Sequence, residues 1–261
     1  MTSDVPAEVV TWRTESQGIM VVTLERPPAN ALGEPLLDGM HAAIEAAEVA
    51  GDVKVMVIAS ALEGFFAAGA DIKHMSAIDA ASFAAYGDKM RAVNDRLAAA
   101  PWISIAAIDG LALGGGLELA MACTLRVSAP RGRFGLPEVK LGLIPGAGGT
   151  QRLPRLVGRG RALDIMLTAR QVEPDEAHAI GLIDRVTDDD VVKAALDLAA
   201  ELVTSSLPAQ LAVVRTVDAA AEVPLADGMR FEAEQEQGLF EHGEAAEGIT
   251  AFIAKRPPNF A

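Results

Sequence analysis

An α/β fold followed by a helical carboxyl-terminal region is predicted by three observations in the 261-residue sequence. Short apolar runs alternate with segments whose apolar residues recur every three or four positions, which is typical of strands alternating with helices. Glycine-rich loops follow several of the apolar runs and precede helical segments. From Arg161 onward, almost every segment has the composition and spacing of a helix. Alternating strands and helices indicate an α/β core.

The apolar runs of the first half are expected to be strands because they are short and several are rich in β-branched residues. These strands are predicted at residues 19–24, 53–59, 103–108 and 125–129. Helices are expected between them, at residues 36–47, 79–100 and 116–122. In the second of these, the apolar stripe that steps by three and four consists of Phe83, Tyr86, Met90, Val93 and Leu97.

The second half is predicted to be mainly helical, with helices at residues 161–169, 174–180, 190–203, 208–221 and 229–240. Only residues 182–186 have the character of a strand. No linker or low-complexity tract separates the two halves. We therefore expect an α/β core over residues 1–200 and a helical region over residues 201–261, which together form one continuous functional unit.

Charge and composition exclude several classes of function. The net charge is −14 and the pI is about 4.7, which argues against nucleic-acid binding and against adhesion to anionic membranes. Cys123 is the only cysteine, so no intramolecular disulfide can form, and its apolar neighbours indicate a buried thiol. The first ten residues do not resemble a signal peptide, and no apolar run reaches the roughly 18 residues of a membrane span. We expect a soluble, cytoplasmic protein.

Common cofactor and nucleophile motifs do not occur. The glycine-rich loop at residues 146–151 has Gln151 where a dinucleotide-binding motif needs its last glycine, and no P-loop is present. No serine lies in the Gly-x-Ser-x-Gly pattern of hydrolases. The four histidines are scattered, so we predict no metal site.

Two glutamates in apolar surroundings are the strongest candidates for chemistry. Glu118 lies two residues after the run Gly114–Gly116, in the first turn of an expected helix, where a carboxylate is costly unless it is paired or functional. Glu138 has apolar neighbours as well. The simpler interpretations are a tight turn for the glycines and an exposed turn residue or helix-cap partner for Glu138.

A third segment, residues 65–73, places small residues before an expected helix, which would allow a ligand to approach the backbone closely. Asp71 can equally be interpreted as the cap of that helix.

Taken in order, these segments resemble the successive signatures of one enzyme family. They are Ala67-Ala68-Gly69-Ala70-Asp71-Ile72-Lys73, Ala112 to Ala120, Phe134 to Glu138, Ile144 to Leu153, and the closing stretch Glu247 to Arg256. The resemblance is to the enoyl-CoA hydratase/isomerase (crotonase) superfamily, and it covers nearly the whole chain in register.

The resemblance implies a crotonase-like spiral of ββα units with a helical trimerisation region, assembled as a homotrimer or a dimer of trimers. It implies that the backbone N–H groups of Ala70 and Gly115 form an oxyanion hole and that Glu118 and Glu138 are the catalytic carboxylates. It further places residues at the coenzyme A (CoA) and acyl site, with the last two reaching the CoA of a neighbouring subunit: Ala68, Ala70, Asp71, Ile72, Lys73, Gly115, Phe252 and Lys255.

The function that follows is the addition of water to a trans-2-enoyl-CoA, giving a 3-hydroxyacyl-CoA through an enolate, as in fatty acid β-oxidation. Glu118 would orient and help to deprotonate the water, and Glu138 would deliver a proton to the α-carbon. No cofactor is expected, because CoA is part of the substrate. The alternatives are a Δ3,Δ2-enoyl-CoA isomerase, a branched-chain hydratase of the methylglutaconyl type, and a non-catalytic acyl-CoA-binding protein.

Overall fold

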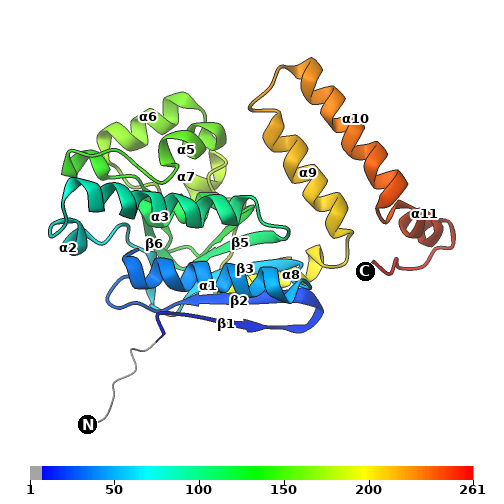
Figure 1. Ribbon diagram of the computed structural model, residues 1–261, viewed down its shortest axis with the longest axis horizontal. Helices are drawn as coiled ribbons and strands as arrows, with labels where there is room; N and C mark the ends of the chain where they lie inside the picture. Colours follow the sequence, from blue (N-terminus) through cyan, green and yellow to red (C-terminus); the bar gives the residue numbers. More distant parts are fainter. Residues whose placement is uncertain (1–7, 261) are drawn as a thin grey trace, which may run out of the picture.

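The larger sheet forms the base of the fold in the computed structural model, which describes residues 8–260 (Figure 1). Within that range its six strands lie in the order β1-β2-β3-β5-β7-β9. Only β1 runs antiparallel to its neighbour, and the other neighbours are parallel. The strands are β1 (Val10–Thr14), β2 (Ile19–Leu24), β3 (Val55–Ser60), β5 (Ile103–Ile108), β7 (Leu125–Ser128) and β9 (Arg185–Val186).

A smaller parallel sheet stacks over the larger one. It contains β4 (Gly64–Ala67), β6 (Gly110–Leu113) and β8 (Arg133–Gly135) in that order. Each of its strands directly follows a strand of the larger sheet, and the pairs β3-β4 and β5-β6 lead into the helices α2 (Ile72–Met75) and α4 (Gly115–Ala122). The expected succession of ββα units is therefore confirmed.

The larger sheet is covered on both faces, which explains why β5 is apolar and buried at nearly every position. Ile103, Ile105 and Ala107 pack in the cluster beneath α8 (Val191–Leu202). Ala106 and Ile108 point the other way, into the cluster that also contains residues of the smaller sheet and of α1 (Glu34–Ala50), α3 (Ala80–Ala98) and α4. The catalytic candidates lie on this second side.

Most predicted helices are confirmed to within a few residues. Besides α1, α3, α4 and α8, they are α6 (Arg159–Thr168), α7 (Pro174–Ala179), α9 (Leu207–Ala219) and α10 (Leu225–His242). One side chain of the α3 stripe lies at the surface, and one predicted strand was too long. Phe83 is 41% exposed because the buried face of α3 begins one turn later, at Tyr86. The predicted strand 182–186 shrinks to β9, since Leu182 and Ile183 close the end of α7 instead.

Several short elements were not predicted from the sequence. These are β1, the three strands of the smaller sheet, and α5 (Gly149–Val157). Each strand of the smaller sheet has only three or four residues and contains glycine, so its hydrophobic periodicity is too short to detect.

The carboxyl-terminal helices α9, α10 and α11 (Ala245–Ile253) stand to one side of the two sheets (Figure 1). They leave large apolar side chains exposed, among them Val213, Val217, Leu225, Met229, Phe240, Phe252 and Ile253. The division at residues 200 and 201 stays a prediction, as does the trimerising role of these helices.

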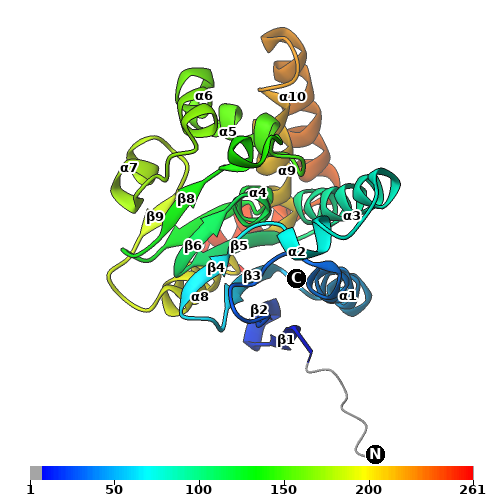
Figure 2. The same ribbon diagram turned by 90° about the vertical axis from the view of Figure 1, so that its left-hand side faces the viewer.

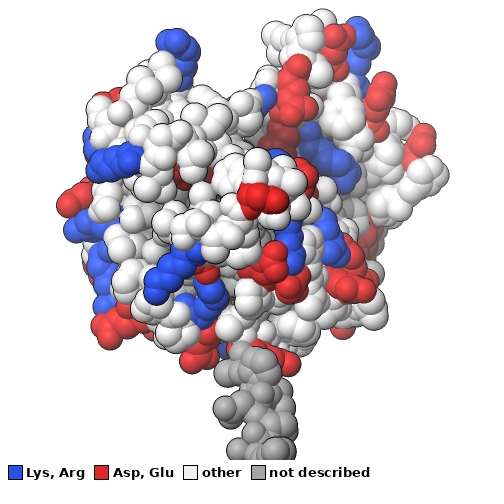
Figure 3. Space-filling view, turned by 60° about the vertical axis from the view of Figure 1, so that its left-hand side comes forward, with Lys and Arg blue, Asp and Glu red and all other residues white. Residues whose placement is uncertain are grey.

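Charged side chains of both signs are interspersed on the face drawn in Figure 3, without a continuous basic surface there.

No helix in residues 8–260 combines the length and the apolar character needed to cross a bilayer.

Close contact between α4 and the smaller sheet gives a testable prediction about stability. A Cβ added at Gly116 would lie 2.0 Å from the backbone oxygen of Ala67, which cannot move aside as a flexible side chain could. We expect Gly116→Ala to lower the free energy of unfolding by about 1–3 kcal/mol or more, as overpacking does. Denaturant or thermal unfolding measures this.

The matched control is Gly160→Ala, at a helical glycine of α6 where an added Cβ meets nothing within 4 Å. It should be neutral or stabilising by up to about 1 kcal/mol, because alanine favours a helix more than glycine does. Equal stability of the two variants would contradict the proposed packing constraint.

Candidate active site

A sharp turn between β6 and α4 brings Glu118 into the interior. Gly114 has φ +52°, and its N–H donates to the carbonyl of Gly135 on β8. The helix that follows is buried at every position. Because Gly116 has no side chain, α4 can lie directly on the end of β4. The first turn of α4 therefore faces the interior between the smaller sheet and α5.

Glu118 is held by a second glycine-rich loop. Its side chain is about 1% exposed, and its Oε1 accepts hydrogen bonds from the N–H groups of Ala147 and Gly149, both at 2.7 Å. Burial raises the pKa of Glu118, whereas these two N–H donors oppose the rise because they stabilise the ionised form. The carboxylate is thus fixed in position, with one oxygen fully engaged.

Glu138 has a contrasting environment. It begins the short 3-10 helix Glu138–Leu141 and is half-buried. Its Oε2 is buried and has no hydrogen-bond partner among the described residues. Its Oε1 lies beside the turn, since a Cβ added at Gly114 would be 2.8 Å from it. Burial, reinforced by the neighbouring charge of Glu118, raises the pKa of Glu138 to about 7.

The N–H groups of Ala70 and Gly115 lie close together at the same place. A Cβ added at Gly115 would be 3.7 Å from the Ala70 nitrogen, and one added at Gly69 would be 3.9 Å from the Gly115 nitrogen. Neither N–H donates a hydrogen bond to any group in residues 8–260. Gly69 has φ +95°, a conformation that favours glycine. The structure therefore brings two free backbone donors together, and their role as an oxyanion hole stays a prediction.

The other expected CoA-site residues continue from Ala70 into α2. The Ala68 N–H donates to the carbonyl of Ala29, and Ile72 and Lys73 are exposed at the start of α2. Asp71 caps α2 by accepting the N–H of His74, as anticipated. It also forms an ion pair with Arg26 at 2.7 Å, a partner that the sequence did not reveal.

Phe252 and Lys255 are not brought to this site within one chain. They lie at and beyond the end of α11, which packs against α10 on the far side of the molecule from α2 (Figure 1). Phe252 is 84% exposed. Their expected contact with the CoA of a neighbouring subunit stays a prediction.

The donors to Glu118 were missed as site residues. Ala147 and Gly149 belong to the run Gly146-Ala147-Gly148-Gly149, whose abundance of glycine was the available signal. The run was compared with nucleotide motifs and included among the family signatures, but neither step assigned its N–H groups a role. A loop with free N–H groups can serve a buried carboxylate of its own chain as well as a phosphate.

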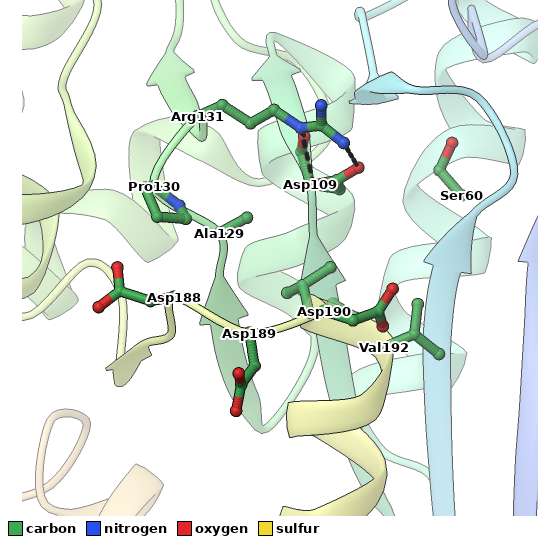
Figure 4. Close-up of a pocket in the computed structure, with 11 residues that line it drawn as sticks. Ser60, Asp109, Ala129, Pro130, Arg131, Asp188, Asp189, Asp190 and Val192 are labelled. Carbon is green, nitrogen blue, oxygen red and sulfur yellow. Dashed lines mark hydrogen bonds and ion pairs between the residues drawn. The ribbon is translucent and has the colours of Figure 1, made fainter.

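A separate cavity lies at the carboxyl ends of the larger sheet's parallel strands, and it is lined by Asp109, Asp188, Asp189, Asp190 and Arg131, among others (Figure 4). Arg131 already pairs with Asp109 and with Glu63. An acidic cavity whose guanidinium is engaged is unsuited to the phosphates of CoA, and no candidate site residue lines it. Within residues 8–260, no group of three or more His, Cys, Asp or Glu residues is placed to hold a metal ion.

The chain is similar over nearly its whole length to known proteins. A family model described as enoyl-CoA hydratase/isomerase matches residues 14–261. A probable enoyl-CoA hydratase of Rhizobium meliloti is 40% identical over 253 residues, covering 96% of this chain and 97% of that protein. The human mitochondrial methylglutaconyl-CoA hydratase is 38% identical over 252 residues, covering 94% and 74% respectively.

The fold is shared with solved structures as well. The crystal structure of an enoyl-CoA hydratase from Bacillus anthracis matches with a TM-score of 0.92 at 30% sequence identity, covering 97% of this chain and 98% of that one. The family match, the whole-length relatives and the common fold lead to one conclusion: the chain belongs to the enoyl-CoA hydratase/isomerase family.

Proposed function

We propose that this protein is an enoyl-CoA hydratase, which adds water to a trans-2-enoyl-CoA to give a 3-hydroxyacyl-CoA. The observation that carries the proposal is the close association of one buried and one half-buried carboxyl group with two free backbone N–H donors. Relatives named as enoyl-CoA hydratases at about 40% identity over the whole chain support it.

The two N–H groups suit the oxygen of a thioester that becomes an enolate. When water attacks the β-carbon, negative charge develops on the thioester oxygen, and the N–H groups of Ala70 and Gly115 would stabilise it there. Losing one such donor typically costs about 3–4 kcal/mol of transition-state stabilisation. Backbone donors are already fixed in place by the loops, so little reorganisation is needed during the reaction.

The two carboxyl groups suit the two proton transfers that hydration requires. Glu118, whose ionised form receives two N–H bonds, would orient the water and take its proton while the oxygen bonds to the β-carbon. Glu138, whose pKa of about 7 leaves about half of it protonated at neutral pH and most of it protonated below that, would give its proton to the α-carbon. Each turnover therefore leaves Glu118 protonated and Glu138 ionised, and a proton must pass from Glu118 to Glu138 before the next cycle. The two groups titrate as a coupled pair.

An isomerase of the same family remains the first alternative. Moving a double bond along the acyl chain requires one carboxyl group that removes a proton and returns it. Here two carboxyl groups with different environments meet at one place, which favours hydration. A non-catalytic acyl-CoA-binding protein would not need either of them.

A branched-chain hydratase is the second candidate, because the human methylglutaconyl-CoA hydratase is nearly as similar to this chain as the first relative. The chemistry would be the same, and only the acyl group would differ. A role in fatty acid β-oxidation, a cytoplasmic location, the lack of a separate cofactor, and assembly as a homotrimer or dimer of trimers with Phe252 and Lys255 reaching a neighbour's CoA also remain predictions.

Replacing each carboxyl group tests the assignment. We expect Glu118→Gln and Glu138→Gln each to lower kcat for crotonyl-CoA hydration by at least about 100-fold, the lower end for an acid–base group. The double variant should be hardly worse than the worse single variant, because groups that act as a unit are not additive. Loss of the enoyl ultraviolet absorbance measures the rate.

Glu45→Gln, an exposed change on α1, is the control and should leave the rate within about twofold, as expected of a surface substitution. If one glutamine variant kept full hydration while the other abolished isomerisation of 3-enoyl-CoA, the isomerase assignment would replace the hydratase.

The raised pKa of Glu138 predicts a specific pH dependence. An acid must be protonated to donate, and the protonated fraction of Glu138 falls as the pH rises through about 7. The kcat/KM of hydration should therefore decline on the alkaline side with an apparent pKa near that value, since kcat/KM reports groups of the free enzyme. The measurement is the dependence of kcat/KM on pH between about pH 5 and about pH 9.

Stability supplies an independent check with a definite sign. The pKa of Glu138 is raised from 4.5 to about 7, so between those values the folded chain binds a proton that the unfolded chain has lost. Stability should accordingly fall as the pH rises through that window. Glu138→Gln should weaken this fall in stability, and the residual activity of the variant should no longer decline on the alkaline side. If the alkaline decline of activity were unchanged in the variant, a group other than Glu138 would be responsible for it.

A further inference from the structure

One buried stripe of α3 contacts the segments that carry the two free N–H donors and the loop that holds Glu118. Tyr86, Met90 and Asn94 follow one another at four-residue steps, so they lie on the same face of the helix. They are 4%, 7% and 3% exposed. Figure 2 shows α3 alongside α4, the helix that carries Glu118. Two of these three buried side chains are polar, which is costly unless they make hydrogen bonds.

The Tyr86 hydroxyl joins the two chain segments around Ala70. It donates to the carbonyl of Leu32 at 2.5 Å and accepts the N–H of Asp71 at 3.0 Å. In addition, the Leu32 N–H donates to the carbonyl of Gly69. Both peptide groups that flank Ala70 are therefore fixed to the segment at Leu32.

This arrangement sets the direction of the free N–H. The carbonyl and the N–H of a trans peptide unit point in opposite directions. Because the Gly69 carbonyl points toward Leu32, the Ala70 N–H of the same peptide unit points away from Leu32. The hydroxyl holds the next peptide unit, so the tilt of Ala70 depends on Tyr86.

Met90 contacts the second donor. A Cβ added at Gly115 would lie 2.7 Å from the Met90 Cε and 3.0 Å from a Leu32 methyl carbon, Cδ1. These two side chains therefore pack directly against the backbone at Gly115.

Asn94 acts at the loop that holds Glu118. Its Nδ2 donates to the carbonyl of Ala147 at 2.9 Å in a buried setting. Arg91, one turn earlier on α3, donates to the carbonyl of Gly146. The Gly146 carbonyl shares a peptide unit with the Ala147 N–H, so Arg91 holds that unit and Asn94 holds the next one. Together they keep the N–H of Ala147 turned toward the Glu118 carboxylate.

We propose that the stripe Tyr86–Met90–Asn94 sets the position of the two N–H donors relative to the Glu118 carboxylate, with Tyr86 and Asn94 as positioning residues. This inference rests on the proposed hydratase function. Neither side chain is assigned a contact with substrate. Each acts through the backbone, Tyr86 on the Ala70 donor and Asn94 on the donors to Glu118, so the two substitutions should leave different kinetic signatures.

Tyr86→Phe removes the hydroxyl and keeps the ring. We expect kcat for crotonyl-CoA hydration to fall by about 10- to 100-fold, as small misplacements of catalytic groups do, with KM changing much less. The apparent pKa values of its pH–rate profile should match those of the wild type, because both carboxyl groups keep their partners. Ser82→Ala, which removes an exposed hydroxyl from the same helix, is the control and should leave kcat within about twofold.

Asn94→Leu keeps the size and removes the donor. Without Asn94, the Ala147 carbonyl keeps only the longer bond from Arg152, at 3.4 Å, so the loop is held less firmly. The bond from the Ala147 N–H to ionised Glu118 should then weaken, which raises the pKa of Glu118. Because Glu118 must be ionised to take a proton from water, activity should fall at low pH as Glu118 becomes protonated. This acid limb of the pH–rate profile should move to higher pH in Asn94→Leu, in contrast to Tyr86→Phe. Unchanged kcat in folded Tyr86→Phe, or an unshifted acid limb in folded Asn94→Leu, would overturn the proposal.

A measurement without turnover keeps the test independent of folding damage and of the hydratase assignment. Tyr86 is the only tyrosine in the chain, so labelling with 3-fluorotyrosine gives a single fluorine resonance beside the Ala70 loop. Binding of acetoacetyl-CoA, whose enolate oxygen can accept the proposed donors, should shift this resonance, whereas free CoA should not. A resonance unaffected by bound acetoacetyl-CoA would contradict coupling between the hydroxyl and the donor.

Discussion

The unequal hydrogen bonding of two neighbouring carboxyl groups is the interaction on which the proposed chemistry depends. Glu118 receives two backbone N–H bonds, whereas the buried Oε2 of Glu138 receives none within the described chain. Like charges at close range and burial both favour a neutral group, and the group with the weaker hydrogen bonding is the one that becomes neutral. One carboxylate and one carboxylic acid can thus coexist near neutral pH.

Backbone packing makes this pair possible. Gly114 turns the chain back beneath Glu138, Gly116 lets α4 approach the end of β4, and Gly149 leaves room beside the Glu118 oxygen, where an added Cβ would lie 3.0 Å away. The same turns expose the N–H of Gly115 next to that of Ala70. The carboxyl pair and the oxyanion donors are therefore consequences of one folded arrangement.

The sequence predicted the alternating core and both glutamates because long apolar strands, periodic helices and isolated carboxylates in apolar runs leave strong local signals. It did not predict the smaller sheet, whose short strands have no detectable period. It also missed contacts between distant segments, such as Arg26 with Asp71 and Asn94 with the Ala147 carbonyl. Tyr86 and Asn94 show why: a polar residue in a helical stripe is known to need a partner, but only the fold identifies it.

The protonation state of Glu138 is the most direct test of this account. Infrared difference spectra between the wild type and Glu138→Gln isolate the carbonyl stretch of the protonated carboxyl group across a pH series. The account predicts a band that belongs to Glu138 and disappears with an apparent pKa of about 7. A Glu138 band that is already lost near the ordinary value of 4.5, with the carboxyl group ionised at neutral pH, would contradict it.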